Sequence, residues 1–368
     1  MARALILGSG AIGRGFLPWV LKGFDIEFYD SNVDLAHGIN QQSGYNSFMS
    51  FPTGLKKKFV ATNGIKTSFS TKEKLEYDIA FSAVGPRNVM GLPRELARLQ
   101  CPLFSLENDP QTVQALKQQF KLTDVFFGVP DVISSSTASP QNLEIDPFSI
   151  HTENGVLYLH KPTNISKGLI NKLELVKWLP LEQLNQEWDA KLYLHNTPHC
   201  IAAFLGHLLN KKYLHEALAV DAIRVVIHGV VDELLQGLKY YTKYDHVFME
   251  NYAKKEVRRF SNELLFDPIN RVARDPLRKL QPGGRLLGAL RLLLSAGINP
   301  TYLMVGLAAA LNYLNKGDSD YNQLSHVKVF GLPAFLHYHL GLNSDSLESK
   351  YIQTKLPQAM AYIDREIL

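Results

Sequence analysis

The feature that most constrains this chain is a wholly apolar run near its start that leads directly into three spaced glycines. The run Ala4 to Leu7 is typical of a strand that is covered on both faces of a parallel sheet. The first glycine of such a pattern permits a tight turn, the second lets the backbone approach a pyrophosphate, and the third lets helix and strand pack closely. We therefore predict a dinucleotide-binding loop, followed by a helix from about residue 11 to residue 22. The G-x-G-x-x-G pattern consists of Gly8, Ser9, Gly10, Ala11, Ile12 and Gly13.

A carboxylate at the end of the next apolar run supports the same interpretation. Asp30 follows Ile26 to Tyr29, a second predicted strand. Its distance from Gly8 is close to the spacing of about 20 residues at which an acid binds an adenosine ribose. Asp30 would repel a 2′-phosphate, and the following Ser31 and Asn32 supply no arginine to bind one. The prediction is NAD rather than NADP, the alternative being that Asp30 is a solvated turn residue.

Strands and helices alternate through the first half of the chain. This alternation predicts a doubly wound, Rossmann-like α/β domain. We expect further strands at residues 78–84, 102–106, 125–127 and 156–159, with helices at 88–99 and 111–120. The Ser/Thr-rich stretch 134–140 is expected to be a loop.

The apolar pattern changes period in the second half. Apolar residues from Ile223 to Leu238 recur at alternating spacings of three and four, as on one face of a helix. Similar stretches at 289–296, 303–314 and 324–339 predict an all-helical carboxyl-terminal domain. We place the domains at residues 1–178, binding the nucleotide, and 179–368, binding the substrate and carrying out catalysis.

Composition excludes several classes of protein. The 368 residues carry a formal net charge of +4 and only two cysteines, Cys101 and Cys200. The sequence has no extended basic tract of the kind that binds nucleic acid, and no apolar stretch is long enough for a membrane span. The cysteines form no metal-binding or disulfide pattern. We expect a cytoplasmic, metal-free protein with small-molecule partners, either a monomer or a small homo-oligomer.

The helical half contains three side chains suited to alcohol oxidation, which needs a proton acceptor and donors that polarise a carbonyl. They are Lys191, Asn196 and His199. In one continuous helix all three would face one cleft, but Pro198 argues for a break. We expect Thr197 to cap a new helix, with Asn196 and His199 at its mouth. On spacing alone, an exposed lysine and a core histidine would be the more ordinary interpretation.

The Lys-x4-Asn-x2-His pattern resembles the signature of the polyol-specific long-chain dehydrogenases, in particular the mannitol-1-phosphate 5-dehydrogenase branch. Other similar blocks lie at residues 8–16, 83–86, 107–108, 195–206, 271–286 and 306–310. The resemblance implies that Lys191 is the general acid/base, that Asn196 and His199 hold the reacting oxygens, and that no metal takes part. Within these blocks, Val84 and Asn108 would lie beside the cofactor.

A lysine that accepts a proton near neutral pH needs a pKa well below its ordinary value of about 10.4. Partial burial or a cationic neighbour would lower it. We expect His199 and the arginines of the following cluster to contribute that field.

A basic cluster between Arg271 and Arg285 is the candidate phosphate site. Arginine forks match phosphate oxygens, and the segment resembles the arginine-rich loop of the family. The first candidates are Arg274, Arg278 and Lys279, the alternative being a solvated basic turn. The chain departs from the family near Asp131, where the expected Val-Asp-Arg element lacks its arginine.

These observations favour NAD-dependent interconversion of mannitol 1-phosphate and fructose 6-phosphate. Because the departures lie near the expected substrate cleft, oxidation of another polyol or of a sugar acid stays open. A nucleotide-binding protein without catalysis is the third alternative, although the complete Lys-Asn-His set argues against it.

Overall fold

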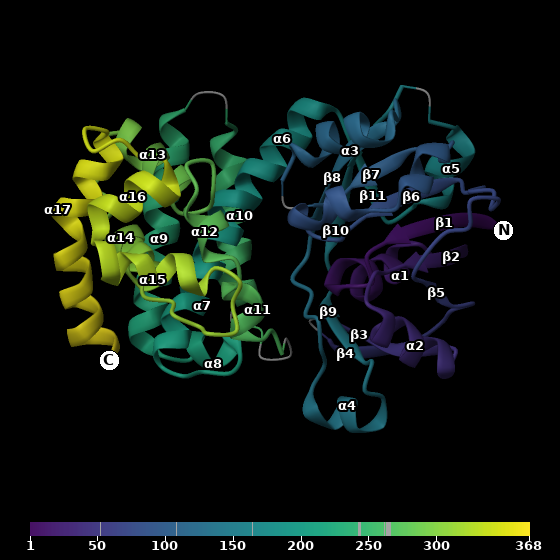
Figure 1. The fold of residues 1–368 in the computed structure, drawn as a ribbon, viewed down its shortest axis with the longest axis horizontal. Helices are drawn as coiled ribbons and strands as arrows, with labels where there is room; N and C mark the ends of the chain where they lie inside the picture. Colours follow the sequence, from purple (N-terminus) through teal and green to yellow (C-terminus); the bar gives the residue numbers. More distant parts are fainter. Residues whose placement is uncertain (52, 108, 164, 242–243, 261, 263–265) are drawn as a thin grey trace. The chain divides into compact units, whose positions relative to one another are not determined.

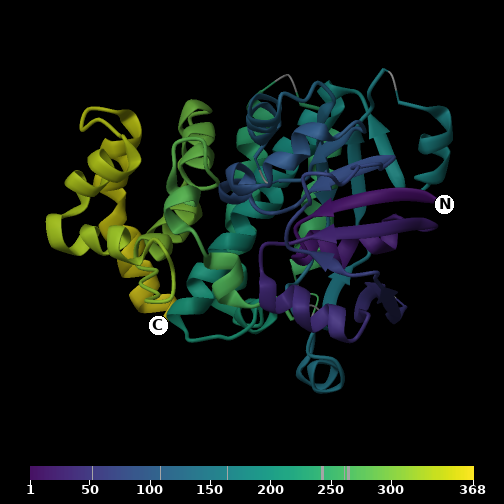
Figure 2. The ribbon, with the colours of Figure 1, turned by 45° about the vertical axis from the view of Figure 1, so that its right-hand side comes forward.

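The computed structural model describes residues 1–51, 53–107, 109–163, 165–241, 244–260, 262 and 266–368 (Figures 1 and 2). Contacts divide the chain into two compact units. Among the described residues, the first contains Met1–Glu187 with Phe266, and the second contains residues 188–262 and Asp267–Leu368. The predicted functional boundary at residue 178 lies slightly before this division. Each unit is described by itself.

The first unit is built on an eight-stranded sheet in the order β11-β10-β8-β7-β6-β1-β2-β5. Every neighbouring pair is parallel except β10 and β8, which are antiparallel. The apolar run of the sequence forms the central β1, whose Leu5, Ile6 and Leu7 are completely buried. The predicted Rossmann-like sheet is confirmed. The strands are β1 (Ala2–Leu7), β2 (Phe24–Tyr29), β5 (Ile65–Lys66), β6 (Ile79–Ser82), β7 (Leu103–Ser105), β8 (Val125–Asp131), β10 (Val156–His160) and β11 (Val176–Leu179).

Helical segments connect these strands. The glycine-rich loop opens a π-helical turn, η1 (Ala11–Phe16), which continues into α1 (Leu17–Val20). The predicted helix at 88–99 is wrong in type, because it consists of two 3-10 segments, η2 (Pro86–Gly91) and η3 (Arg94–Arg98), with Pro93 between them. A proline inside an α-helix removes a backbone donor and clashes with the preceding turn. The α-helices are α2 (Val33–Gln41), α3 (Thr112–Phe120), α4 (Pro140–Ile145), α5 (Lys167–Lys172) and α6 (Leu181–Ala190).

A second, three-stranded sheet in the order β4-β3-β9 belongs to the same unit. It consists of β3 (Gly44–Phe51), β4 (Gly54–Ala61) and β9 (Ile150–Glu153), and it was not predicted. Helix α4 projects from this region in both views (Figures 1 and 2). The connection between β8 and α4 passes through the expected Ser/Thr-rich loop, which a single bridge from Ser134 to Thr152 joins to β9.

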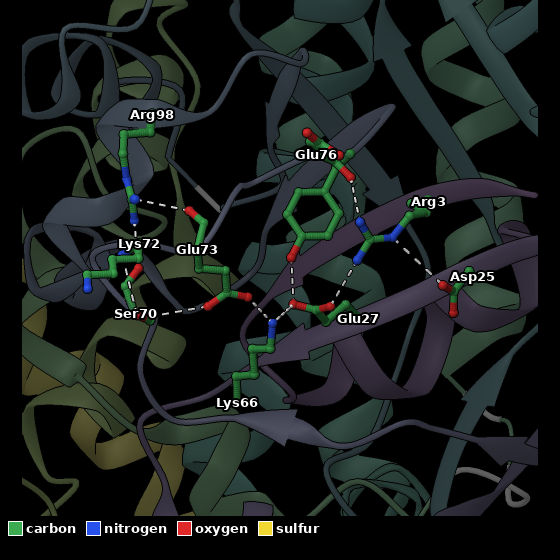
Figure 3. Close-up of polar contacts among 10 residues, drawn as sticks. Arg3, Asp25, Glu27, Lys66, Ser70, Lys72, Glu73, Glu76 and Arg98 are labelled. Carbon is green, nitrogen blue, oxygen red and sulfur yellow. Dashed lines mark hydrogen bonds and ion pairs between the residues drawn. The ribbon is translucent and has the colours of Figure 1, made fainter.

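A network of charged side chains joins β1, β2 and β5 of the large sheet (Figure 3). Glu27 on β2 lies 3.3 Å from Arg3 on β1 and 2.6 Å from Lys66 on β5. Lys66 also pairs with Glu73, and Arg98 donates hydrogen bonds to backbone carbonyls of the segment around Glu73. The network ties the loop after β5 to the strands, whereas isolated surface pairs contribute little.

The second unit is helical, as predicted. Helix α14 is apolar on all sides and packs against α7, α9 and α17, so it forms the centre of the unit. The predicted helix at 324–339 is two helices, α15 and α16, which are separated at Gly331 by a backbone φ of 83°. The α-helices are α7 (Thr197–Leu208), α8 (Leu214–Leu218), α9 (Asp221–Tyr240), α10 (His246–Phe260), α11 (Ile269–Ala273), α12 (Pro276–Leu280), α13 (Leu287–Ser295), α14 (Thr301–Leu311), α15 (Tyr321–Phe330), α16 (Leu332–Leu340) and α17 (Leu347–Tyr362), with π-helical turns η4 (Lys191–Asn196) and η5 (Ile363–Ile367).

The described residues contain neither a helix that could span a membrane nor a cluster of metal-binding side chains. Neither unit has a described helix that is both long and apolar enough to cross a bilayer. Across the same residues, no group of three or more His, Cys, Asp or Glu side chains is arranged to hold a metal ion.

Candidate active site

Two glycines of the loop after β1 are required by its packing. Gly8 has a φ of 97°, and a Cβ placed on it would lie 2.6 Å from the carbonyl oxygen of Ala83. A Cβ on Gly13 would lie 1.8 Å from the carbonyl oxygen of Gly8. Both contacts are far inside van der Waals distance. The loop can therefore keep this shape only with glycine at these two positions.

Gly10 is glycine for a different reason. A Cβ placed there meets no atom within 4 Å, so the protein itself does not require glycine at this position. Open space beside the backbone is what close approach of a pyrophosphate needs. The neighbouring Ser9 hydroxyl is buried and has no hydrogen-bond partner in the described part of the chain. Together with Ala11 and Ile12, which begin η1, these residues fit a bound dinucleotide.

Asp30 connects the end of β2 to this loop. Its Oδ2 accepts a hydrogen bond from the backbone N–H of Ser9 at 2.6 Å, and its Oδ1 accepts one from the N–H of Asn32 at 2.9 Å. The ribose-binding role predicted from the sequence therefore coincides with a role in holding the loop. The adjacent Asn32 caps α2 by accepting from the N–H of Leu35.

Arg14, which the sequence analysis did not select, lies buried behind the loop. Its Nε donates to the carbonyl of Ser9 at 3.1 Å, and its guanidinium stacks 5.0 Å from the ring of Tyr45. The Tyr45 hydroxyl donates to the Arg14 carbonyl at 2.8 Å. Burial lowers the pKa of Arg14. A buried cation here favours an anion at the loop, and an arginine directly after the third glycine was the available signal.

Val84 lies just beyond the carboxyl end of β6, where open α/β sheets bind their ligands. Its N–H donates to Glu107 Oε1 at 2.9 Å, and the N–H of Gly85 donates to Oε2 at 2.8 Å. Glu107 also accepts from the Ser82 hydroxyl at 2.7 Å, and burial raises the pKa of its carboxyl. Glu107 thus shapes the turn that carries Val84. The predicted Asn108 lies outside the described residues.

The Lys-Asn-His set lies on a continuous helical backbone, and the predicted break at Thr197 is wrong. The π-helical turn η4 runs directly into α7, with Asn196 and Thr197 both in the right-handed helical region. The wider turn accommodates Pro198, because the N–H and hydroxyl of Thr197 both reach the Leu192 carbonyl. The hydroxyl also donates to the Arg285 carbonyl at 2.9 Å. Such π-helical turns are frequent at functional sites.

All three predicted side chains of this set are buried. Lys191 is 4% exposed, so the ordinary interpretation of it as a surface lysine is wrong. Asn196 is equally buried, and its Nδ2 has no hydrogen-bond partner among the described residues.

His199 is held between α7, α10 and the segment before α11. Its ring stacks on Phe260 with an interplanar angle of 10°, and its Nε2 lies 3.7 Å from Asp267 Oδ2. Burial lowers the pKa of His199 well below its ordinary value, and the nearby His195, Arg271 and Arg285 act in the same direction. His199 is therefore neutral at neutral pH. It does not supply the cationic field that we expected it to provide for Lys191.

His195 and Glu256 form a buried pair that the sequence analysis did not identify. His195 Nδ1 lies 2.5 Å from Glu256 Oε2, and the His195 ring is 5.1 Å from that of His199. Glu256 also pairs with Arg259 and lies 3.3 Å from Lys255. His195 lies on the same π-helical turn as Lys191, whereas Glu256 lies on α10. No local signal links residues so far apart in the chain.

The basic cluster separates into an interior and an exterior part. Arg274 is exposed, and Arg278 is partly exposed, 3.8 Å from Asp275. Lys279, in contrast, is 1% exposed, and its Nζ donates to the carbonyl of Arg274. Burial lowers the pKa of Lys279 well below its ordinary value. Two of the three phosphate candidates are thus accessible, whereas Lys279 lies in the helical core beside Phe204.

Comparisons with known proteins place the chain among polyol dehydrogenases. Residues 187–333 match the family described as mannitol dehydrogenase C-terminal domain. Mannitol-1-phosphate 5-dehydrogenase of Caldanaerobacter subterraneus is 26% identical over 387 residues, which cover 96% of this chain and 99% of that protein. The enzyme of the same name from an Exiguobacterium species is 28% identical and covers 92% and 94%, respectively.

Solved structures show the same fold. Pseudomonas fluorescens mannitol 2-dehydrogenase, in a ternary complex with NAD and D-mannitol, aligns with a TM-score of 0.76 over 99% of this chain and 92% of that chain, at 12% identity. D-sorbitol dehydrogenase aligns with a TM-score of 0.67 over 98% and 93%, at 13% identity. The predicted Rossmann-like and helical combination is confirmed, and the chain is similar to mannitol-1-phosphate 5-dehydrogenases over most of its length.

Proposed function

We propose that this chain is an NAD-dependent oxidoreductase that interconverts D-mannitol 1-phosphate and D-fructose 6-phosphate. The observation that carries the proposal is the buried Lys191 on a π-helical turn with Asn196 and His199, each of which has a buried polar atom without a hydrogen-bond partner among the described residues. The relatives named mannitol-1-phosphate 5-dehydrogenase align over nearly the whole chain and support the choice of substrate.

The first unit would hold NAD through its glycine-rich loop. The backbone at Gly10 and the N–H groups that begin η1 would meet the pyrophosphate, because a helix start favours negative charge. Asp30 would accept a hydrogen bond from a ribose hydroxyl, and Val84 would lie beside the bound nucleotide. When bound, NAD supplies the hydride acceptor of the oxidation.

Lys191 would act as the general base for oxidation of the alcohol. Its neutral amine accepts the hydroxyl proton as hydride leaves the carbon that bears the hydroxyl group. In the reverse direction, Lys191 returns the proton to that oxygen. The amide of Asn196 donates to the oxygen as it becomes a carbonyl. His199, being neutral, can offer its one ring N–H to a hydroxyl of the substrate without repelling a protonated Lys191.

The phosphate would bind at the exterior part of the basic cluster. The Arg274 side chain is exposed and that of Arg278 is partly exposed, and guanidinium groups suit two-point contacts with phosphate oxygens. Lys279 would contribute by holding the carbonyl of Arg274 and thereby the shape of the segment.

A second candidate function is oxidation of an unphosphorylated polyol or a sugar acid. Two observations favour it, namely the missing arginine after Asp131 and the inward position of Lys279. Both reduce the number of cations available to a phosphate.

Reduction of fructose 6-phosphate, fructose and fructuronate, with NADH and NADPH in parallel, tests these alternatives. We expect a strong preference for fructose 6-phosphate with NADH. Equal rates with fructose and its phosphate would contradict the phosphate site, and preferred reduction of fructuronate would favour the second candidate. Tight NADH binding without turnover of any of the three would indicate a protein that has lost catalysis.

A further inference from the structure

Three buried polar atoms near the start of α7 have no hydrogen-bond partner in the described part of the second unit. They are Asn196 Nδ2, His199 Nε2 and Asp267 Oδ2. Buried polar groups without partners are costly and rare in folded proteins. Because two of the three belong to the proposed catalytic set, the third marks a further residue of the same site.

Asp267 lies just before α11 and is 1% exposed. Its Oδ1 accepts from Arg271 Nε at 2.6 Å and lies 2.5 Å from Arg271 Nη2. One oxygen of the carboxylate is thereby fixed. The other, Oδ2, is left 3.7 Å from His199 Nε2, which is too far for a direct hydrogen bond.

The separation of these two atoms suits one bridging oxygen. An oxygen at ordinary hydrogen-bond lengths of about 2.7–3.0 Å can contact both atoms at once. That oxygen must carry a hydrogen, since an ionised carboxylate only accepts. A hydroxyl meets both requirements, because it donates to Asp267 and accepts from a ring N–H of His199. A phosphate oxygen without a proton cannot donate, and its charge would be repelled.

We propose that Asp267 is a specificity-determining residue whose free oxygen accepts a hydrogen bond from a non-reacting hydroxyl of the substrate. His199 shares the same hydroxyl. This inference rests on the proposed function, in that it requires a polyhydroxy substrate, but it does not depend on whether that substrate carries a phosphate.

The test compares the wild type with Asp267→Asn, which replaces the free acceptor by a donor at nearly unchanged size. Glu233→Gln is the matched control, because Glu233 is also buried but uses both oxygens to accept from Tyr302 and Leu303 at the start of α14. The substrate is whichever ketose of the three-member panel the wild type reduces best. The NADH dissociation constant and the melting temperature of each variant report on folding.

We expect Asp267→Asn to raise KM about 10- to 100-fold, with kcat changed less than threefold and NADH binding unchanged. Glu233→Gln should keep the wild-type KM. An unchanged KM in Asp267→Asn would mean that only a water occupies the gap, and a loss confined to kcat would mean that Asp267 acts through His199. Either result overturns the proposal.

Deoxy analogues of the same ketose test the contact without depending on the stability of any variant. With the wild type, removal of the contacted hydroxyl should lower kcat/KM about as much as Asp267→Asn does. If Asp267→Asn folds, the same deoxy analogue should not lower the kcat/KM of this variant any further. If no single deoxy position is sensitive in the wild type, the proposal is wrong.

Failure of the proposed function gives a separate result. In that case the wild type binds NADH but reduces none of the three ketoses. Saturation-transfer NMR then measures binding of mannitol 1-phosphate to the NADH complexes of the wild type and of Asp267→Asn, and this comparison tests the role of Asp267. Binding that Asp267→Asn abolishes would support the contact, whereas equal or absent binding would overturn it.

Discussion

Asp30 Oδ2 accepts a 2.6 Å hydrogen bond from the backbone N–H of Ser9, so the end of β2 holds the glycine-rich loop that follows β1. The same carboxylate is the predicted partner of a nucleotide ribose. One side chain would therefore both shape the loop and select its ligand, and changes at Asp30 should affect both properties.

Asp30→Ala should raise the dissociation constant for NADH about tenfold, since a charge-assisted hydrogen bond is lost. NADPH should be affected less, because the negative charge that repels its 2′-phosphate is also removed. Titration of both nucleotides by fluorescence measures the ratio. Asp34→Ala, at an exposed position in the first turn of α2, is the control. An unchanged ratio would contradict the predicted ribose contact.

Gly10→Ala and Gly13→Ala should fail in different ways. A Cβ on Gly13 collides with the Gly8 carbonyl, so Gly13→Ala should lower the free energy of unfolding by about 1–3 kcal/mol. A Cβ on Gly10 meets no protein atom, so Gly10→Ala should keep its stability and bind NADH at least tenfold more weakly. Chemical denaturation and nucleotide titration distinguish the two variants. Full NADH affinity in Gly10→Ala would place the nucleotide elsewhere.

Lys191→Met should lower kcat by about 10²–10⁴, the range typical of a lost general acid/base, and leave NADH affinity unchanged. Methionine fills a buried position without the amine, so folding should persist. Stopped-flow measurement of a single turnover checks the chemical step directly. Lys316→Met, at an exposed position, is the control. A variant with near-normal turnover would exclude Lys191 as the proton acceptor.

Arg274→Ala should raise KM for fructose 6-phosphate about tenfold, because one charged hydrogen-bond donor to phosphate is removed. KM for free fructose should not change. Steady-state kinetics with both ketoses gives the comparison, and Arg365→Ala, another exposed arginine, is the control. Equal effects on the two substrates would show that Arg274 does not contact phosphate.

His151 predicts a pH dependence of stability. Burial lowers its pKa to about 4, and both ring nitrogens lack partners among the described residues. The unfolded chain binds a proton near pH 6.5, whereas the folded protein does so only near pH 4. Stability should therefore fall as the pH decreases between these values, by about 3 kcal/mol from this group.

His151→Leu should remove that part of the acid sensitivity. Urea denaturation at pH 7 and pH 4 should give a smaller difference for the variant than for the wild type, and exposed His37→Leu serves as the control. Identical differences in wild type and His151→Leu would show that His151 does not contribute.

The nucleotide-binding loop was predictable because its requirements are local. A buried strand, the spaced glycines and Asp30 lie within one βαβ unit, and each residue type has a backbone reason that the sequence displays. The helical face of α9 was predictable in the same way, from its apolar period. Around Pro93 and at Gly331, a proline and a glycine interrupt segments that their apolar pattern predicted to be single helices.

The sequence by itself determined the class of fold and the glycine-rich loop, because these depend on neighbouring residues, whereas the Lys-Asn-His set was predicted through its resemblance to a family signature. Tertiary structure decided the rest. Packing between distant helices paired His195 with Glu256, placed Asp267 beside His199 and buried Lys279. Such contacts depend on how helices meet in space, and the burial that they create lowers the pKa of His199 and of Lys279, so no local pattern reports them.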